Sequence, residues 1–217
     1  MRAKMYSVFK KLIQPTFIYP ILIRLRDYKD VSAWKLKGKP VPPPDFIKQQ
    51  AVKEYARKFS IKILVETGTC VGTMVYATRN FFEQIFSIEL SHNLCEEAKE
   101  RFAKFSHIHI FEGDSSKVLS TILVSINQPC IFWLDAHYSG GITVLGERIT
   151  PILEELKEIF AHPQKNHIIL IDDARHFNGL DDFPTLAELK KFVLKNRHGW
   201  LFEINDDIIR LSPLTKS

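Results

Sequence analysis

Short apolar runs alternate along the chain with longer segments of mixed polarity. Runs of this kind, rich in Ile, Val and Leu, are typical of strands that are buried on both faces of a parallel sheet. Five of them precede helical patterns, at residues 61–65, 85–89, 108–111, 130–135 and 168–173. Two further runs, 200–204 and 208–211, flank Asn205-Asp-Asp207 and predict a hairpin. The pattern predicts an α/β fold: a mostly parallel sheet of about seven strands, with helices on both faces and a terminal antiparallel hairpin.

Apolar residues at helical spacing occupy the segments between the runs. The first helix is expected to begin at Asp45, whose carboxylate is a good N-terminal cap. The others are expected at residues 73–83, 92–104, 151–161 and 184–196, and in the segment that ends at Val124. Ahead of Asp45, Pro40-Val-Pro-Pro-Pro44 predicts an extended linker. We therefore expect an α/β domain over residues 45–217, preceded by an N-terminal arm and Pro-rich linker over residues 1–44.

The net charge of +5 is concentrated in the arm. Residues 1–50 hold 11 Lys and Arg against 3 Asp and Glu, whereas the rest of the chain holds 19 against 22. A basic groove for nucleic acid across the domain is therefore not expected. Cations alternate with apolar residues in the arm, and Pro15 and Pro20 interrupt it. We expect the arm either to lie on an anionic membrane surface or to pack on the domain or in a homo-oligomer.

Two observations bear on the compartment. No apolar run reaches the roughly 18 residues that a membrane-spanning helix needs. The three cysteines show no metal-type spacing, and a sparse, odd set is typical of free thiols in a reducing compartment. A cytoplasmic location is therefore expected, with peripheral membrane contact if the arm binds lipid.

A glycine loop follows the first predicted strand. Glu66-Thr-Gly-Thr-Cys-Val-Gly72 leads from this strand into a helix, and its glycines allow a tight turn and a close approach to a ligand. The free N–H groups of the helix point back at that ligand. A dinucleotide site has the spacing Gly-x-Gly-x-x-Gly, whereas here an acid precedes a wider Gly-x-x-x-Gly. The loop therefore suits a cationic or hydroxyl-rich ligand better than a pyrophosphate.

Each of the five predicted parallel strands ends in or just before an acidic residue. Carboxylates are poor strand residues, and ligands of an open α/β sheet lie outside the carboxyl ends of its strands. The acids are Glu66, Glu89, Asp114, Asp135, Asp172 and Asp173. Glu89 lies 21 positions after Gly68, where a carboxylate commonly accepts hydrogen bonds from both ribose hydroxyls of a nucleotide cofactor. Asp114 has helix capping as an alternative role.

The glycine loop and the Gly113-Asp-Ser115 segment together resemble class I S-adenosylmethionine-dependent methyltransferases. The resemblance extends over about residues 45–213 and implies a Rossmann-like, doubly wound sheet of seven strands. It also implies that S-adenosyl-L-methionine is the cofactor. The cofactor-binding residues that it implies are Glu66, Gly68, Thr69, Gly72, Glu89, Asp114 and Ser115.

One Asp after the fourth strand and an Asp pair after the fifth resemble the metal-dependent, macrocin O-methyltransferase-like family. Three carboxylates make an all-oxygen site for Mg²⁺ or another divalent cation, so Asp135, Asp172 and Asp173 are the predicted ligands. In that family the metal binds adjacent substrate hydroxyls and lowers the pKa of one. The chain departs from the family at His137 and His176, and either imidazole is a candidate general base beside Asp135 if no metal is present.

The sequence thus predicts an enzyme that transfers a methyl group from S-adenosylmethionine to an oxygen nucleophile of a small molecule. A sugar or polyol hydroxyl is the favoured acceptor, on family likeness. Two alternatives stay open: an NAD-type oxidoreductase on a similar sheet, and a non-catalytic module that docks to a membrane or partner through its arm. The glycine-rich segment Tyr138–Gly146 is expected to be a lid over the site.

Overall fold

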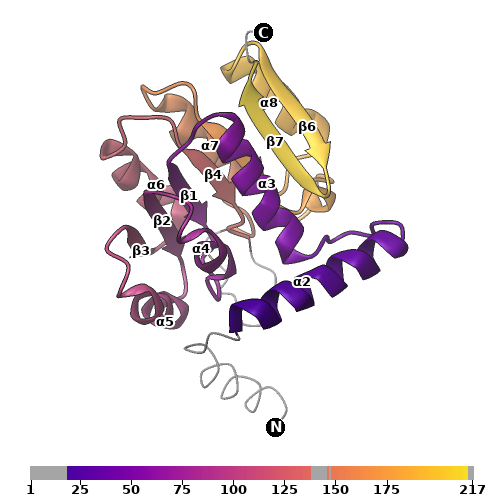
Figure 1. Ribbon diagram of the computed structural model, residues 1–217. Coiled ribbons are helices and arrows are strands. Elements are labelled where there is room, and N and C mark those ends of the chain that lie inside the picture. Colours follow the sequence, from indigo (N-terminus) through magenta and orange to yellow (C-terminus); the bar gives the residue numbers. More distant parts are fainter. Residues whose placement is uncertain (1–18, 138–145, 147, 215–217) are drawn as a thin grey trace.

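The computed structural model describes residues 19–137, 146 and 148–214 as one α/β unit built around a seven-stranded sheet (Figure 1). The strands are β1 Ile63–Thr67, β2 Gln84–Glu89, β3 Ile108–Glu112, β4 Ile131–Leu134, β5 Ile168–Ile171, β6 Trp200–Asn205 and β7 Ile208–Pro213. The helices are α2 Tyr19–Leu36, α3 Asp45–Lys58, α4 Thr73–Thr78, α5 His92–Phe102, α6 Ser115–Val124, α7 Ile152–Ala161, the 3₁₀ turn η1 Ala174–His176 and α8 Leu186–Asn196.

The strand order is β3-β2-β1-β4-β5-β7-β6. The first five strands are parallel, and β7 pairs antiparallel with both β5 and β6. The predicted mostly parallel sheet with a terminal antiparallel hairpin is therefore confirmed. The order reverses at β1, so β1 and β4 diverge into crossovers on opposite sides and leave a crevice at their carboxyl ends, where open α/β sheets bind ligands.

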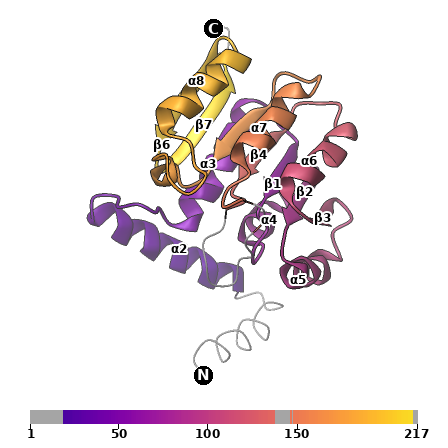
Figure 2. The same ribbon diagram turned by 180° about the vertical axis from the view of Figure 1, so that it is seen from behind.

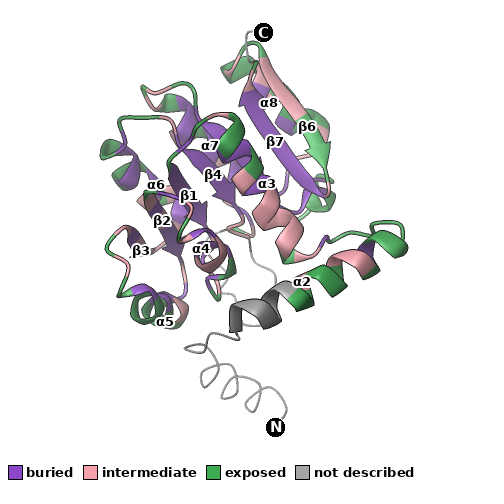
Figure 3. Ribbon diagram, in the orientation of Figure 1, coloured by how far each residue is buried: buried purple, intermediate pink, exposed green. Residues whose placement is uncertain are grey.

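Side chains of the central strands alternate between two hydrophobic layers. In β4, Phe132 and Leu134 belong to the layer under α6, α7 and α8, whereas Ile131 and Trp133 belong to the layer under α3, α4 and α5. Figures 1 and 2 show these helices on the two faces of the sheet, and Figure 3 shows the central strands as the buried part of the molecule. Burial on both faces explains why β4 and β5 are continuous apolar runs.

Several element boundaries differ from the predicted ones. Glu66 lies inside β1 rather than at its end, in register with Ser87 and Trp133. Helix α4 stops at Thr78, whose hydroxyl bonds the carbonyl of Met74, instead of continuing to residue 83. The prediction that Asp45 caps α3 is wrong, because Pro44 occupies the cap position and no side chain bonds the first turn.

Helix α2 belongs to the segment that was expected to be an interrupted arm. Pro20 lies in its first turn. The N–H groups of a first turn have no partner inside the helix, so a proline there costs no hydrogen bond and does not break the helix. The helix lies at the end of the molecule where the parallel strands have their carboxyl ends (Figures 1 and 2). Trp34 is buried and donates from Nε1 to the carbonyl of Pro40 at 2.7 Å, which ties the linker back to the helix. Among the helices of the described ranges, none is long and apolar enough to cross a membrane.

Candidate functional site

A cavity of about 340 Å³ opens at the carboxyl ends of β1 to β4. Six of the residues singled out in the sequence line it: Gly68, Glu89, Asp114, Ser115, Asp135 and His137. They lie at or just after the carboxyl ends of four different strands, and the parallel arrangement of those strands brings these ends to one edge of the sheet. The structure therefore places most of the predicted cofactor residues around one cavity, which Asp135 and His137 also line.

Glu89 is held rigidly at the end of β2. Its Oε2 accepts a hydrogen bond from the Cys70 amide at 2.6 Å, and its Oε1 accepts one from the Ser91 amide at 2.9 Å. Each carboxylate oxygen has a second lone pair, so both oxygens retain acceptor capacity toward a ligand hydroxyl. The glycine loop and the second strand are thus locked together by the same side chain that faces the cavity.

Asp114 and Ser115 lie where α6 begins. Asp114 caps the helix, because its Oδ1 accepts from the Ser116 amide at 2.9 Å and from the Ser116 hydroxyl at 2.7 Å. Its carboxylate also lines the cavity, so capping and ligand contact are compatible. Ser115 is buried beside Glu155 of α7, and burial raises the pKa of that carboxyl to about 7.

A second cavity, of about 70 Å³, lies on the α3 side of the glycine loop and is lined by Glu66, Gly68 and Thr69 among others. The Ser87 hydroxyl donates to Glu66 and lies 2.6 Å from the Thr69 hydroxyl. Burial raises the pKa of Glu66 to about 8, although the bond from Ser87 opposes the shift. Glu66 therefore favours its protonated form near neutral pH, and an approaching cation favours the ionised form.

Gly72 lines neither of these cavities. It has a left-handed backbone, with φ of +70°, and a Cβ there would lie 2.9 Å from the Phe102 ring. Its amide donates to the carbonyl of Thr69 at 2.7 Å. Turn geometry and close packing against α5 account for this glycine.

The carboxylates of Asp135, Asp172 and Asp173 come together, as predicted, with one oxygen of each within 4.8 Å of the others. Asp172 and Asp173 are buried, and the Asp135 side chain is 32% exposed. Desolvation, followed by repulsion from Asp172, raises the pKa of Asp135 well above its ordinary value. Burial raises the pKa of Asp172 to about 6. Burial would also raise the pKa of Asp173, but Lys48 and Arg175 outweigh it and lower that pKa.

Two cations lie within this acidic cluster. The Lys48 ammonium, from α3, bonds Oδ2 of Asp172 and lies 3.3 Å from Oδ1 of Asp173. Arg175 donates to the same Oδ1 at 2.7 Å and also pairs with Asp207 in the β6–β7 turn. Burial lowers the pKa of Lys48, yet the carboxylates of Asp172 and Asp173 raise it overall, so Lys48 stays charged. Three carboxylates are suitable ligands for a divalent cation. Here, however, the Lys48 ammonium lies between two of them, those of Asp172 and Asp173.

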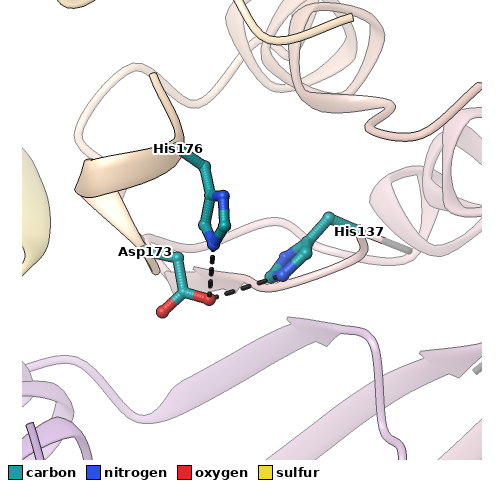
Figure 4. Close-up of side chains that lie close together, drawn as sticks. All are labelled: His137, Asp173 and His176. Atoms are coloured by element: carbon teal, nitrogen blue, oxygen red, sulfur yellow. Dashed lines mark ion pairs between the residues drawn. The ribbon is translucent and has the colours of Figure 1, made fainter. Parts of the chain in front are cut away.

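His137 and His176 both face Oδ2 of Asp173 (Figure 4). The Nε2 atom of His137 is 3.4 Å from this oxygen, and that of His176 is 4.0 Å from it. His137 also places Nδ1 at 3.4 Å from Oδ1 of Asp135, and its side chain is only 12% exposed, against 45% for His176. Burial lowers the pKa of His137, although Asp173 opposes the shift. His137 therefore lines the cavity as a neutral, oriented imidazole, while His176 lies outside it.

Lys48 is a site residue that no pattern in the sequence indicated. It lies 124 positions before Asp172 and looks like any lysine on the polar side of an amphipathic helix. Arg148 and Glu154, which pair at 3.3 Å, also line the large cavity. The expected lid, residues 138–146, falls outside the described residues except for Gly146, which lines the cavity as well.

No protein-family model matches the chain, and no curated protein matches it. Several solved methyltransferase structures share its fold. The O-methyltransferase TomG from Streptomyces achromogenes, in complex with S-adenosylmethionine, has a TM-score of 0.58 at 15% identity, over 88% of this chain and 89% of TomG. The methyltransferase PaMTH1 of Podospora anserina, bound to S-adenosylhomocysteine, has a TM-score of 0.55 at 17% identity, over 92% and 98% of the two chains.

An O-methyltransferase from Bacillus cereus, in complex with S-adenosylhomocysteine, is similar over 86% of this chain and 90% of its own, with a TM-score of 0.56 and 10% identity. These likenesses establish the fold as the Rossmann-like fold of S-adenosylmethionine-dependent methyltransferases. At such identities they do not extend to the activity, which rests on the site. The finer resemblance to the macrocin-like family remains a prediction.

Proposed function

We propose that the protein transfers a methyl group from S-adenosylmethionine to an oxygen nucleophile of a small molecule. The observation that carries the proposal is the composition of the large cavity. Gly68, Glu89 and Asp114, which are the residues expected to hold the cofactor, line the same cavity as Asp135 and His137. A cofactor bound between them has its reactive group near a residue that accepts protons, which is the arrangement that methyl transfer to a hydroxyl requires.

When bound, S-adenosylmethionine supplies an activated methyl group on a sulfonium. The chain supplies its recognition. Glu89 accepts hydrogen bonds from hydroxyls, and Gly68 lets the backbone approach the ligand. The buried Glu66 supports a positive charge beside the glycine loop when it ionises.

His137 is the proton acceptor in this proposal. Its imidazole is neutral and buried, so one ring nitrogen carries a proton and faces a carboxylate, while the other has a free lone pair. That second nitrogen takes the proton of the acceptor hydroxyl as the oxygen–methyl bond forms and the sulfur–methyl bond breaks. The products are a methyl ether, S-adenosylhomocysteine and an imidazolium, which releases its proton to solvent. Asp135 and Asp173 stabilise that imidazolium.

The acceptor side of the site favours a hydroxyl-rich substrate such as a sugar or polyol. Beyond the cavity, the half-exposed imidazole of His176 offers a further hydrogen-bonding group. A second hydroxyl of the substrate has a partner there while the first meets His137. A panel of sugars, polyols and phenols with radiolabelled cofactor tests this preference, and methylation confined to phenols would contradict it.

The NAD-type alternative is disfavoured by the sheet. A dinucleotide fold has a parallel sixth strand beyond β5, whereas here the antiparallel β7 occupies that place. Calorimetric titration with S-adenosylhomocysteine and, separately, with NAD decides between the two. We expect micromolar binding of the first and no binding of NAD; the opposite result overturns the proposed function.

Docking of residues 1–44 to an anionic membrane or to a partner remains a separate prediction, as does homo-oligomer formation. Deleting residues 1–39 tests it. A catalytic role for the domain predicts that cofactor binding survives the deletion, whereas a purely docking module predicts that all function is lost with the arm.

A further inference from the structure

Asp172 and Asp173, the buried acid pair at the end of β5, already have a cationic partner in the protein, the ammonium of Lys48. Lys48 has a side chain that is 16% exposed, and it reaches the pair from the first turns of α3, whose apolar face is anchored in the core through Ala51, Val52 and Tyr55. The ammonium bonds Oδ2 of Asp172 and lies 3.3 Å from Oδ1 of Asp173. Burying a charge is costly unless it is paired, so each partner fixes the other in place.

Protein donors occupy three of the four carboxylate oxygens of Asp172 and Asp173. Asp172 has one oxygen on Lys48, and its Oδ1 accepts the backbone amide of Asp173 at 2.8 Å. Oδ1 of Asp173 is shared by Lys48 and Arg175. Of the four oxygens of this pair, Oδ2 of Asp173 is the one that none of these donors contacts, and it faces the two histidines instead.

A divalent cation at the three-acid position therefore meets two fixed positive groups. To bind Asp172 and Asp173 together it must displace the Lys48 ammonium, which is held by its own helix, or approach it at short range. Like charges at such distances in a poorly solvated site repel strongly. The site that the sequence predicts for a metal is in this respect a poor fit for one.

We propose that Lys48 is the resident cation of this site: it holds Asp172 and Asp173 in place of a divalent metal, so the protein works without one. Lys48 is a positioning residue in this scheme, because it acts through the acid pair and, through Asp173, on the orientation of His137. The link to methyl transfer rests on the proposed function, whereas the place of Lys48 in the acid pair does not.

The test is calorimetric titration of the full chain with Mg²⁺, which prefers oxygen ligands to imidazole. We expect weak binding to the wild type and binding at least about tenfold tighter to Lys48→Met, which empties the acid site without adding a charge. Lys58→Met, at the exposed end of the same helix, is the matched control and should bind as the wild type does. The gain in Lys48→Met should disappear when Asp172→Asn is added.

Two outcomes of this titration overturn the proposal. One is micromolar Mg²⁺ binding to the wild type that is lost in Asp172→Asn. The other is a folded Lys48→Met that binds Mg²⁺ no better than the wild type. If Lys48→Met does not fold, Lys48→Arg replaces it: retained stability with unchanged weak metal binding supports a resident cation, and a gain in metal affinity despite the kept charge contradicts it.

The proposed function is tested separately, by S-adenosylhomocysteine binding to the wild type in the presence of a chelator. Binding there with no dependence on Mg²⁺ supports both proposals. Absence of cofactor binding overturns the methyltransferase function and leaves the Mg²⁺ titration as the measure of Lys48 alone. Cofactor binding that requires Mg²⁺, lost again in Asp172→Asn, overturns the resident cation and leaves the methyltransferase function standing.

Discussion

The backbone of Gly68 passes directly against the carbonyl of Asp135. A Cβ at residue 68 would lie 2.5 Å from that oxygen, and the glycine has a φ of +86°. This contact joins the loop after β1 to the loop after β4 at the point where the sheet order reverses. The glycine is thus required by the close approach of two loops that carry the site, in addition to any approach of a ligand.

We expect Gly68→Ala to destabilise the fold by more than the cost of placing an alanine in the left-handed backbone region. An L-residue in the left-handed region costs about 1–2 kcal/mol, and forcing a methyl group into a backbone oxygen adds about 1–3 kcal/mol. Gly38→Ala is the matched control, because Gly38 has a φ of +80° and open space around it. Urea unfolding of both variants measures the difference; equal losses would show that the Asp135 contact relaxes freely.

Glu89→Gln should weaken S-adenosylhomocysteine binding about 10- to 100-fold, because charge-assisted hydrogen bonds contribute about 1.5–3 kcal/mol and the new amide faces backbone N–H groups. Glu112→Gln is the control: Glu112 pairs with Glu89 in the β2–β3 register but has a side chain that is 40% exposed. Calorimetry on both variants is the measurement. A comparable loss in the control would point to a general effect of charge rather than to contact with the ligand.

The two histidines near Asp173 are expected to differ in effect. His137→Gln should lower kcat about 10²- to 10⁴-fold, as removal of a general base does, and leave cofactor affinity nearly unchanged. His176→Gln should have a small effect, since His176 is half-exposed and lies outside the cavity. Steady-state kinetics with an acceptor from the substrate panel checks this. If kcat falls further in His176→Gln than in His137→Gln, His176 rather than His137 is the proton acceptor.

The parallel strands could be predicted because burial on both faces leaves a simple pattern. Ile168 to Ile171 is a continuous apolar run ended by acids, and the structure places it inside the sheet, between β4 and β7, with its acids at the site. The topology rule that carboxyl ends of parallel strands share one edge then groups the strand-end acids correctly.

The rest could not be predicted because it depends on contacts between distant segments. Lys48 occupies a polar position of a helix, and no local pattern distinguishes it from a solvated lysine until α3 is packed on β5. Glu66 was expected at a strand end because carboxylates disfavour strands, yet Ser87 on the neighbouring strand supplies the partner that permits burial. Helix α2 carries a proline and several charges and shows no clear apolar stripe, so it resembled an irregular arm.

A buried chain of hydrogen bonds at the other end of the sheet makes stability depend on pH. The Cys130 amide donates to Nδ1 of His167 at 3.2 Å, so His167 carries its proton on Nε2, 2.9 Å from Nδ1 of His162. His162 in turn donates from Nε2 to the carbonyl of Leu123 at 3.1 Å. Burial, with repulsion from His162, lowers the pKa of His167 from 6.5 to about 4.

The folded pKa of His167 lies below the unfolded one, so the unfolded state binds more protons between pH 6.5 and about 4. Stability is therefore lost as the pH falls through this window, by about 3 kcal/mol for this residue alone. Urea unfolding at pH 7 and pH 4.5 should show a smaller pH effect in His167→Gln than in the wild type. His198→Gln, at an exposed position, should behave as the wild type. If His167→Gln loses as much stability between pH 7 and pH 4.5 as the wild type does, His167 is not the source of the pH dependence.

Asp114 both caps α6 and lines the cavity, and substitution can separate these two roles because a different carboxylate oxygen serves each. Oδ1 caps α6 through Ser116, which leaves Oδ2 on the cavity side, toward Gly146. Asp114→Ser keeps a capping hydroxyl and removes the carboxylate, so stability should stay within a few tenths of a kcal/mol while S-adenosylhomocysteine affinity falls. Asp114→Ala should lose the affinity and about 1 kcal/mol of stability. Thermal unfolding and calorimetry on the two variants measure both effects, and full affinity in Asp114→Ser would reduce Asp114 to a helix cap.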